Sequence, residues 1–325
     1  TLQTACKTDT GYNALLDKHP IHAMAPLTIY ILCHNRLDYA RQAISSVLGQ
    51  TCQAFTLVVS DNSSNDDVER MVTNEFPEIH YIRRSPMLKP LEHFNRCIAE
   101  AKSDYFCLFH DDDVMEPDFV ESMEKCLHAY PTAIAIGCNA RIEKLGKLKL
   151  RACFWSFRRH ELIDTPLSLA RRYFSRAQSG SAPFPGYVYN RRLVGDQRLP
   201  VEGGKYADVI WLMGLARKGS IVWLNKLLMT YRFHGGNDSS TESLRDRLRL
   251  LGFLKLNMEI FDADLLQDYR RAFIYKKMLN AHAGTHHERR RLAIAFLKNY
   301  RWTRYTRLDY YKAAAVRALA KLVAT

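Results

Sequence analysis

The 325-residue sequence contains eight cysteines, but none of them form the C-x-x-C pairs that are typical of structural zinc sites and thiol redox sites. Most of the cysteines lie inside apolar runs. A thiol in such a run packs as a small hydrophobic side chain. We therefore expect reduced cysteines and a cytoplasmic setting.

Long hydrophobic runs are absent too. A helix that spans a bilayer needs roughly 18 consecutive apolar residues, and no run in the sequence approaches that length. No basic segment followed by an apolar one opens the chain, so we expect no secretory signal peptide and a soluble or peripheral protein. Because the first residue is Thr1 rather than methionine, we also expect a processed chain or a part of a longer one.

Acidic residues are fewer than basic ones: the sequence has 34 Asp and Glu and 47 Lys and Arg, which gives a formal net charge of +13. An excess of this size suits nucleic acid, an anionic membrane surface or an anionic substrate. Residues 285–325, which we name the basic tail, contain ten Lys and Arg against Glu288 and Asp309. The tail also carries aliphatic and aromatic residues at loosely helical spacing. This composition is typical of a helix at a membrane interface, but also of a helix packed on residues 241–284, and both interpretations stay open.

From Leu27 to about Glu143, β-rich apolar segments alternate with amphipathic helical ones. The predicted strands are 27–35, 55–63, 79–85, 105–112 and 132–142, and the predicted helices are 38–50, 66–76, 90–101 and 117–130. Such alternation predicts an α/β fold with a mostly parallel sheet that helices cover on both faces.

Farther along the chain, residues 178–188 are rich in small residues and proline and are predicted to form a loop. A helix at 205–219 and a strand at 220–234 complete the α/β unit, and long amphipathic helices follow. We therefore divide the chain into an N-terminal extension (1–26), an α/β domain (27–240) and a C-terminal α-helical region (241–325).

Three aspartates follow the predicted strand in "YFCLFHDDDVMEPDF" (105–119), where a buried strand meets a surface loop. In open α/β sheets, ligands bind at the carboxyl ends of the strands. Asp111, Asp112 and Asp113 repel one another unless a positive group joins them, so a bound divalent cation is one explanation. An acidic loop that caps the next helix is the other.

Three more polar motifs follow strands in the same way: "CHNR" (33–36), "VVSDNSSND" (58–66) and "YRFHGGNDS" (231–239). In a parallel sheet all four motifs gather at one edge. Their order and spacing over residues 27–240 resemble those of the inverting family 2 glycosyltransferases, which have the Rossmann-like GT-A fold.

The resemblance implies that the three aspartates are the D-x-D motif, which holds Mg²⁺ or Mn²⁺ against the diphosphate of a nucleotide-sugar donor. Such a cation neutralises the charge that develops on the departing diphosphate. Asp111 and Asp113 are the expected metal ligands, and Asp111 and Asp112 are also expected to contact the donor. Many members of the family have an aspartate at the position of His110.

By the same resemblance, Asp61 accepts hydrogen bonds from the base or ribose of the donor, and His34, Asn35 and Arg36 frame the nucleoside. A carboxylate suits this role because it is an acceptor only and can receive two donors. The alternative for Asp61 is an ordinary turn before a helix cap.

The resemblance further identifies Asp208 as the general base that removes the proton of the acceptor hydroxyl. The family usually has a Glu-Asp pair here, whereas this sequence has Ala207-Asp208. A helix N-terminus keeps a carboxylate ionised, as a base requires, although a plain helix cap explains the residue too. His234 is expected to bind the metal or approach the diphosphate, and Arg232 is expected to support it and to contact the donor.

Taken together, the resemblance implies a metal-dependent, inverting glycosyltransferase that is cytoplasmic or peripheral at the inner face of the cell membrane. It would move a sugar from a UDP- or dTDP-sugar to a glycan or lipid-linked acceptor during bacterial surface polysaccharide assembly. One alternative is a basic nucleic-acid-binding protein, but clustered aspartates repel phosphates and no such motif is present, so we expect no nucleic-acid partner. The other is a nucleotidyltransferase, whose glycine-rich phosphate loop is missing from "CHNRLDYA".

Overall fold

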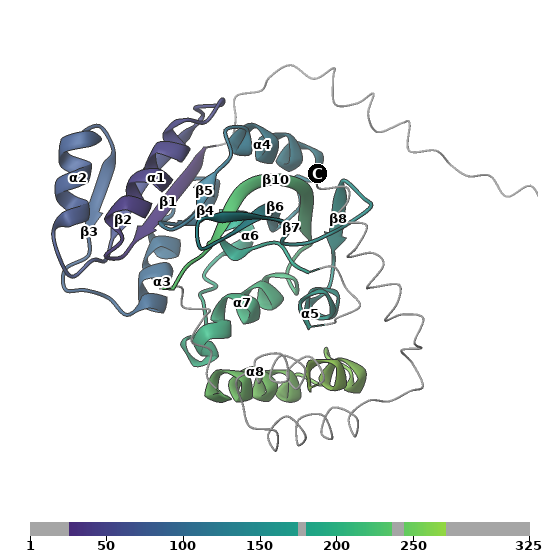
Figure 1. Cartoon of the computed structure of the whole chain (residues 1–325). Coiled ribbons are helices and arrows are strands. Elements are labelled where there is room, and N and C mark those ends of the chain that lie inside the picture. Colours follow the sequence, from purple (N-terminus) through teal and green to yellow (C-terminus); the bar gives the residue numbers. More distant parts are fainter. Residues whose placement is uncertain (1–25, 175–179, 236–243, 271–325) are drawn as a thin grey trace, which may run out of the picture.

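The computed structural model describes residues 26–174, 180–235 and 244–270 (Figure 1). In chain order the elements are β1 (Leu27–Cys33), α1 (Leu37–Leu48), β2 (Phe55–Asp61), α2 (Asp67–Glu75), β3 (His80–Arg83), α3 (Pro90–Glu100), β4 (Tyr105–His110), β5 (Val114–Met115), α4 (Phe119–Ala129), β6 (Ala135–Lys144), β7 (Lys147–Ala152), β8 (His160–Ile163), α5 (Pro166–Phe174), the 3₁₀ helix η2 (Phe184–Gly186), β9 (Tyr187–Asn190), α6 (Arg191–Val194), the 3₁₀ helix η3 (Val201–Tyr206), α7 (Ala207–Leu215), β10 (Ile221–Phe233) and α8 (Leu244–Leu256).

One sheet joins all the strands, in the order β3-β2-β1-β4-β9-β6-β10-β5, with β7 beside β6 and β8 beside β10. The first four strands are parallel, and so are β6 and β10. The predicted α/β fold with a sheet between helices is confirmed. All four motif-bearing strands run in one direction, so their carboxyl ends meet at one edge of the sheet.

The second half of the sheet is mixed rather than parallel. Strand β9 pairs antiparallel to both β4 and β6, and β5, β7 and β8 also pair antiparallel to their neighbours. The predicted loop at 178–188 therefore runs into a buried strand. A four-residue strand between two longer ones takes its pairing from tertiary contacts, which a local pattern does not reveal.

Helices cover both faces of the sheet because side chains alternate along each strand. Ile29 and Ile31 of β1 pack in one core cluster, which includes residues of α1, α2 and α4. Tyr30 and Leu32 pack in the other, which includes residues of α3, α5, α7 and α8. In Figure 1, α4 lies above the sheet, and α5, α7 and α8 lie below it. The cysteines in the described residues are free thiols, and most are buried.

Helix α8 shares a hydrophobic core with the sheet. Leu250 and Leu254 are fully buried in the same cluster as Trp211 of α7. The close approach shows at Gly204 in η3, where φ is +57° and an added Cβ would lie 2.5 Å from the Oδ1 atom of Asp246. The division of the chain at residue 240 stays a prediction, and the basic tail lies outside the described residues. Among those residues, no helix is long and apolar enough to cross a bilayer.

Candidate active site

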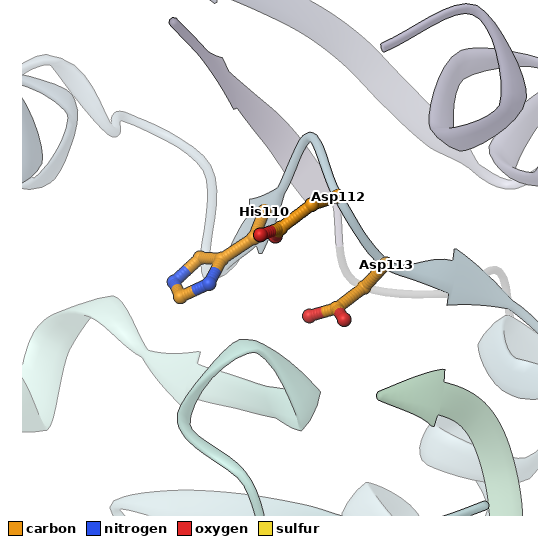
Figure 2. Close-up of side chains that lie close together, drawn as sticks. All are labelled: His110, Asp112 and Asp113. Atoms are coloured by element: carbon orange, nitrogen blue, oxygen red, sulfur yellow. The ribbon is translucent and has the colours of Figure 1, made fainter. Parts of the chain in front are cut away.

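The three aspartates occupy the turn between β4 and β5, which we name the acidic turn (residues 110–113). Asp111, Asp112 and Asp113 are all buried. His110, Asp112 and Asp113 each offer one ligand atom, and these atoms all lie within 4.8 Å of one another. Figure 2 shows the three side chains extending from the turn in the same direction. The turn therefore gathers two carboxylates and an imidazole around one point.

Asp113 is the most deeply buried residue of the turn, with no exposed surface. Its Oδ1 atom accepts a hydrogen bond of 2.9 Å from the backbone N–H of Arg232 at the end of β10. Its Oδ2 atom is buried and accepts no hydrogen bond from any described residue. Burial and the neighbouring charge of Asp112 raise the pKa of Asp113 well above its usual value.

Burying a carboxylate oxygen without a hydrogen-bond partner lowers the free energy of unfolding, unless a cation binds the oxygen. Carboxylate oxygens are the ligands that hard divalent cations prefer, and an imidazole nitrogen is compatible with Mn²⁺. The donor set of the acidic turn therefore fits Mg²⁺ or Mn²⁺.

Asp111 is engaged differently from its two neighbours. Its Oδ2 accepts from the backbone N–H of His34 at 2.8 Å, and its Oδ1 accepts from Arg36 at 2.8 Å. The Arg36 guanidinium also lies 3.4 Å from Asp112. Burial raises the pKa of Asp111 to about 6, although Arg36 opposes the rise. Arg36 thus supplies a positive charge at the acidic turn from the first strand-end loop, and Asp111 lies outside the gathered ligand atoms.

His234 comes to the acidic turn from the carboxyl end of β10. Its Nε2 atom lies 2.9 Å from the Oδ2 atom of Asp112. Its ring stacks on Tyr39 of α1 with a centroid separation of 4.8 Å, at an interplanar angle of 22°. The polar residues at 34–36, 61–64, 110–113 and 234, far apart in sequence, thus lie at one edge of the sheet, as the strand-end motifs predicted.

Arg232 contributes to the site mainly through its backbone. Its guanidinium donates to Gln42 at 2.6 Å, lies 3.6 Å from Glu143, and sits 5.4 Å from the centroid of the Tyr39 ring. The side chain therefore braces β10 against α1 while the N–H orients Asp113. The predicted contact between Arg232 and a donor stays a prediction.

Asp61 lies at the carboxyl end of β2 and is fully buried. Its Oδ2 atom accepts from the Tyr81 hydroxyl at 2.7 Å and from Arg83 at 2.8 Å, both on β3. Its Oδ1 atom accepts from the backbone N–H of Ser63. The carboxylate is thus fixed in place by two side chains of the adjacent strand, and the guanidinium of Arg83 balances its charge.

The loops after β1 and β2 hold each other. His34 Nδ1 donates to the carbonyl oxygen of Asn62 at 2.8 Å, and the Asn35 N–H donates to the Ser63 hydroxyl at 2.8 Å. Asn35 has a φ of +55°, in the left-handed region that asparagine tolerates better than most residues. Its side-chain oxygen accepts from Ser64. The two loops form a single unit, which we name the paired loops (residues 34–36 and 61–64).

Asp208 is in the first turn of α7 and is partly buried. Desolvation raises its pKa to about 6. The charges of Asp113, Asp112 and Asp208 all help to raise the pKa of the Tyr231 hydroxyl, which burial raises most. Asp208 therefore lies within electrostatic reach of the same tyrosine as the acidic turn.

Sequence reasoning missed several residues of the site: His110, Tyr39, Tyr81 and Arg83. The sequence does carry a signal for His110, because this residue immediately precedes the three aspartates at the end of a predicted strand. Nothing comparable marks Tyr39, Tyr81 or Arg83, since they reach the site through helix and strand packing.

Comparisons with known proteins agree with this geometry. The family model described as glycosyl transferase family 2 matches residues 28–178. Chondroitin synthase from Pasteurella multocida is 24% identical over 233 residues. That match covers 69% of this chain and 22% of the synthase, so the chain spans about a fifth of the length of this curated relative.

Two solved structures share the fold. Residues 1–349 of TarS from S. aureus, in complex with UDP-GlcNAc, align with a TM-score of 0.60 at 14% identity, over 91% of this chain and 88% of that one. The mannosyltransferase PcManGT from Pyrobaculum calidifontis, in complex with GDP-Man and Mn²⁺, aligns with a TM-score of 0.55 at 14% identity, over 95% and 92%. Residues 28–178 therefore match glycosyl transferase family 2, and the chain has the GT-A fold.

Proposed function

We propose that the chain is a metal-dependent, inverting glycosyltransferase that moves a sugar from a nucleotide-sugar donor to a hydroxyl of an acceptor. The observation that carries the proposal is the orphaned Oδ2 atom of Asp113 beside Asp112 and His110. The match to glycosyl transferase family 2 supports the transfer of a sugar. The complexes of TarS with UDP-GlcNAc and of PcManGT with GDP-Man and Mn²⁺ support the classes of donor and cofactor.

In this proposal His110, Asp112 and Asp113 hold Mg²⁺ or Mn²⁺. The cation, when bound, neutralises negative charge on the diphosphate as the bond to the sugar breaks. Asp111 and His234, the other ligands expected from the sequence, orient the turn through their contacts with Arg36 and Asp112.

The paired loops receive the nucleoside, with Asp61 as the acceptor of hydrogen bonds from the base or ribose. Tyr81 and Arg83 hold its carboxylate in place, which lowers the cost of ordering it when the donor binds. Arg36 already lies against the acidic turn, so its guanidinium is placed to contact a diphosphate oxygen. We propose a UDP- or dTDP-sugar as the donor.

Asp208 acts as the general base and takes the proton of the acceptor hydroxyl on a carboxylate oxygen. Its raised pKa makes it a stronger base than an exposed aspartate. Direct displacement at the anomeric carbon then inverts its configuration. We propose a glycan or lipid-linked glycan as the acceptor, in bacterial surface polysaccharide assembly at the inner face of the cell membrane.

The metal assignment is tested with Asp113→Asn, which removes one carboxylate charge at nearly constant volume. We expect calorimetric titration with UDP or dTDP and Mn²⁺ to show affinity lowered by about tenfold or more in the variant. Asp104→Asn is the matched control, because Asp104 is exposed and directly precedes β4, at the end of the strand opposite to the acidic turn.

Equal affinity of Asp113→Asn and the wild type for the nucleoside diphosphate would overturn the metal assignment.

The class of reaction is tested separately by incubation with nucleotide sugars and with nucleoside triphosphates. Consumption of only the triphosphates would favour nucleotidyl transfer and contradict the proposal. NMR of the product reports the anomeric configuration, and retention would rule out single displacement.

A further inference from the structure

The turn between β6 and β7 presents exposed leucine and lysine side chains side by side, and we name it the hairpin tip (residues 144–149). Leu145 is 73% exposed and Leu148 is 63% exposed. Lys144, Lys147 and Lys149 are exposed as well. Neither leucine belongs to the core clusters of the described residues, so neither contributes to the packing seen there.

Leu145 is unfavourable at its position for a second reason. Its φ is +52°, in the left-handed region that bulky side chains rarely adopt. An asparagine or glycine would occupy this position at lower cost and without exposing apolar surface. The exposure of the Leu145 side chain and its left-handed backbone conformation are both unfavourable in the described fold. This indicates that Leu145 makes a contact outside that fold.

The charge of the hairpin tip is positive and uncompensated. Within the described residues, Lys144, Lys147 and Lys149 have no ion-pair partner. The nearest acid in the hairpin, Glu143, lies 3.6 Å from Arg232. A small surface with both exposed leucines and unpaired lysines suits a partner that is apolar and anionic at once.

We propose that the hairpin tip docks on an anionic lipid bilayer, with Leu145 and Leu148 at the acyl boundary and the lysines at the headgroups. Lysines reach headgroups easily, because their long apolar stems lie along the membrane surface. The basic tail and a second hairpin tip carry the same sign of charge and repel this surface. A polyanion such as nucleic acid attracts the lysines but gains nothing from the leucines.

The position of the hairpin tip relates membrane docking to the site. The backbone N–H of Leu145 donates to the carbonyl oxygen of Phe233 at 3.0 Å, and Lys144 pairs with Phe233 across the sheet. Phe233 directly precedes His234, which contacts Asp112 of the acidic turn. Docking of the tip thus brings the acidic edge of the sheet to the membrane surface, whichever sugar the site transfers.

The test uses the full chain and vesicles of phosphatidylcholine with or without phosphatidylglycerol. The wild type should bind only the anionic vesicles. The double variant Leu145→Asn/Leu148→Asn should lower the partition coefficient by about tenfold or more, because two leucines leave the interface. Asparagine tolerates a positive φ, so loss of binding does not come from misfolding. Leu256→Asn, at an exposed site on α8, is the matched control and should change nothing.

A second readout separates the hairpin tip from any contribution of the basic tail. A tryptophan introduced by Leu148→Trp should be quenched by brominated lipids on binding to the anionic vesicles, beyond any quenching in the wild type. Absence of added quenching, an unchanged partition coefficient in the double variant, or failure of the full chain to bind anionic vesicles at low salt would each overturn the proposal. These outcomes are independent of nucleotide binding, so they test the hairpin tip separately from the proposed sugar transfer.

Discussion

Asp208 carries the clearest pH dependence at the scale of single residues. Its pKa is raised to about 6, so the carboxylate is ionised above this pH and loses its charge below it. As the proposed general base, Asp208 must be ionised to accept a proton, and we therefore expect kcat to fall about tenfold per pH unit below pH 6. Rates measured between pH 4.5 and 8 with saturating donor would check this expectation.

The variant Asp208→Asn distinguishes a base from a helix cap. If Asp208 is the base, the variant should have a kcat lower than that of the wild type by roughly a hundredfold or more. Its affinity for the nucleoside diphosphate should remain near that of the wild type. The fall in kcat below pH 6 should also become weaker in the variant, because only the aspartates of the acidic turn then titrate. Near-normal turnover in the variant would reduce Asp208 to a cap.

The residue scale also shows what a sequence can predict about a site. The strand-end motifs placed Asp61, Asp111, Asp113 and His234 at one edge because chain direction in a parallel sheet determines that edge. The partners within the site were not predictable. Arg36 pairs with Asp111, which is 75 positions farther along the chain, and no local pattern indicates which acid its guanidinium contacts.

At the scale of elements, a buried polar network connects β2 with α3. Ser60 Oγ lies 2.7 Å from His93 Nε2 and accepts from Arg84, whose guanidinium also pairs with Glu100. The Arg84 N–H donates to the carbonyl oxygen of Asp61. The network therefore contacts the residues next to the paired loops and fixes the end of β2 that carries Asp61.

This network predicts a pH-dependent stability. Burial, aided by the nearby Arg84 charge, lowers the pKa of His93 to about 4 from 6.5. Between these values the unfolded chain takes up a proton that the folded chain excludes, so stability falls as the pH drops from 6.5 to 4. The change is at most about 1.4 kcal/mol per pH unit for this group.

Urea unfolding at pH 7 and pH 5 checks the prediction. His93→Gln should show a smaller loss of unfolding free energy between the two pH values than the wild type does. His80→Gln, at an exposed position of β3, should keep the wild-type dependence. An identical pH dependence in His93→Gln and the wild type would contradict the role of His93.

The predicted elements differ from the observed ones in an instructive way. The long apolar strands β1, β2, β4, β6 and β10 were predicted, because buried strands read as continuous hydrophobic runs. Strand β7 and helix α5 were not predicted, although the sequence of each has the expected periodicity. Lysine and leucine alternate in the strand. In the helix, apolar residues recur at helical spacing: Pro166, Leu169, Ala170 and Phe174. Strand β5 has two residues and forms only because β10 lies beside it.

At the scale of the whole molecule, the shared core implies that α8 and the sheet unfold together. Leu254→Ala should lower the free energy of unfolding by about 2–4 kcal/mol, because Leu254 is fully buried. Leu256→Ala, two positions along and 84% exposed, should change it by less than about 0.5 kcal/mol.

Denaturation followed both by tryptophan fluorescence and by far-UV circular dichroism would show whether the unit is cooperative. We expect coincident transitions, which Leu254→Ala shifts together. A separate transition that Leu254→Ala alone displaces would mean that the helical region folds independently of the sheet.

The position of β9 determines the order in which the molecule can be assembled during translation. Strand β6 follows β4 in the chain after only the two-residue β5 and helix α4, yet β4 and β6 are each hydrogen-bonded to β9 instead of to each other. The β4 edge must therefore remain open until Tyr187–Asn190 leave the ribosome. At about 5–20 residues per second, this wait is on the order of ten seconds. During that interval the nascent chain carries an unpaired apolar strand edge, which is a natural binding site for chaperones and a point at which aggregation can begin.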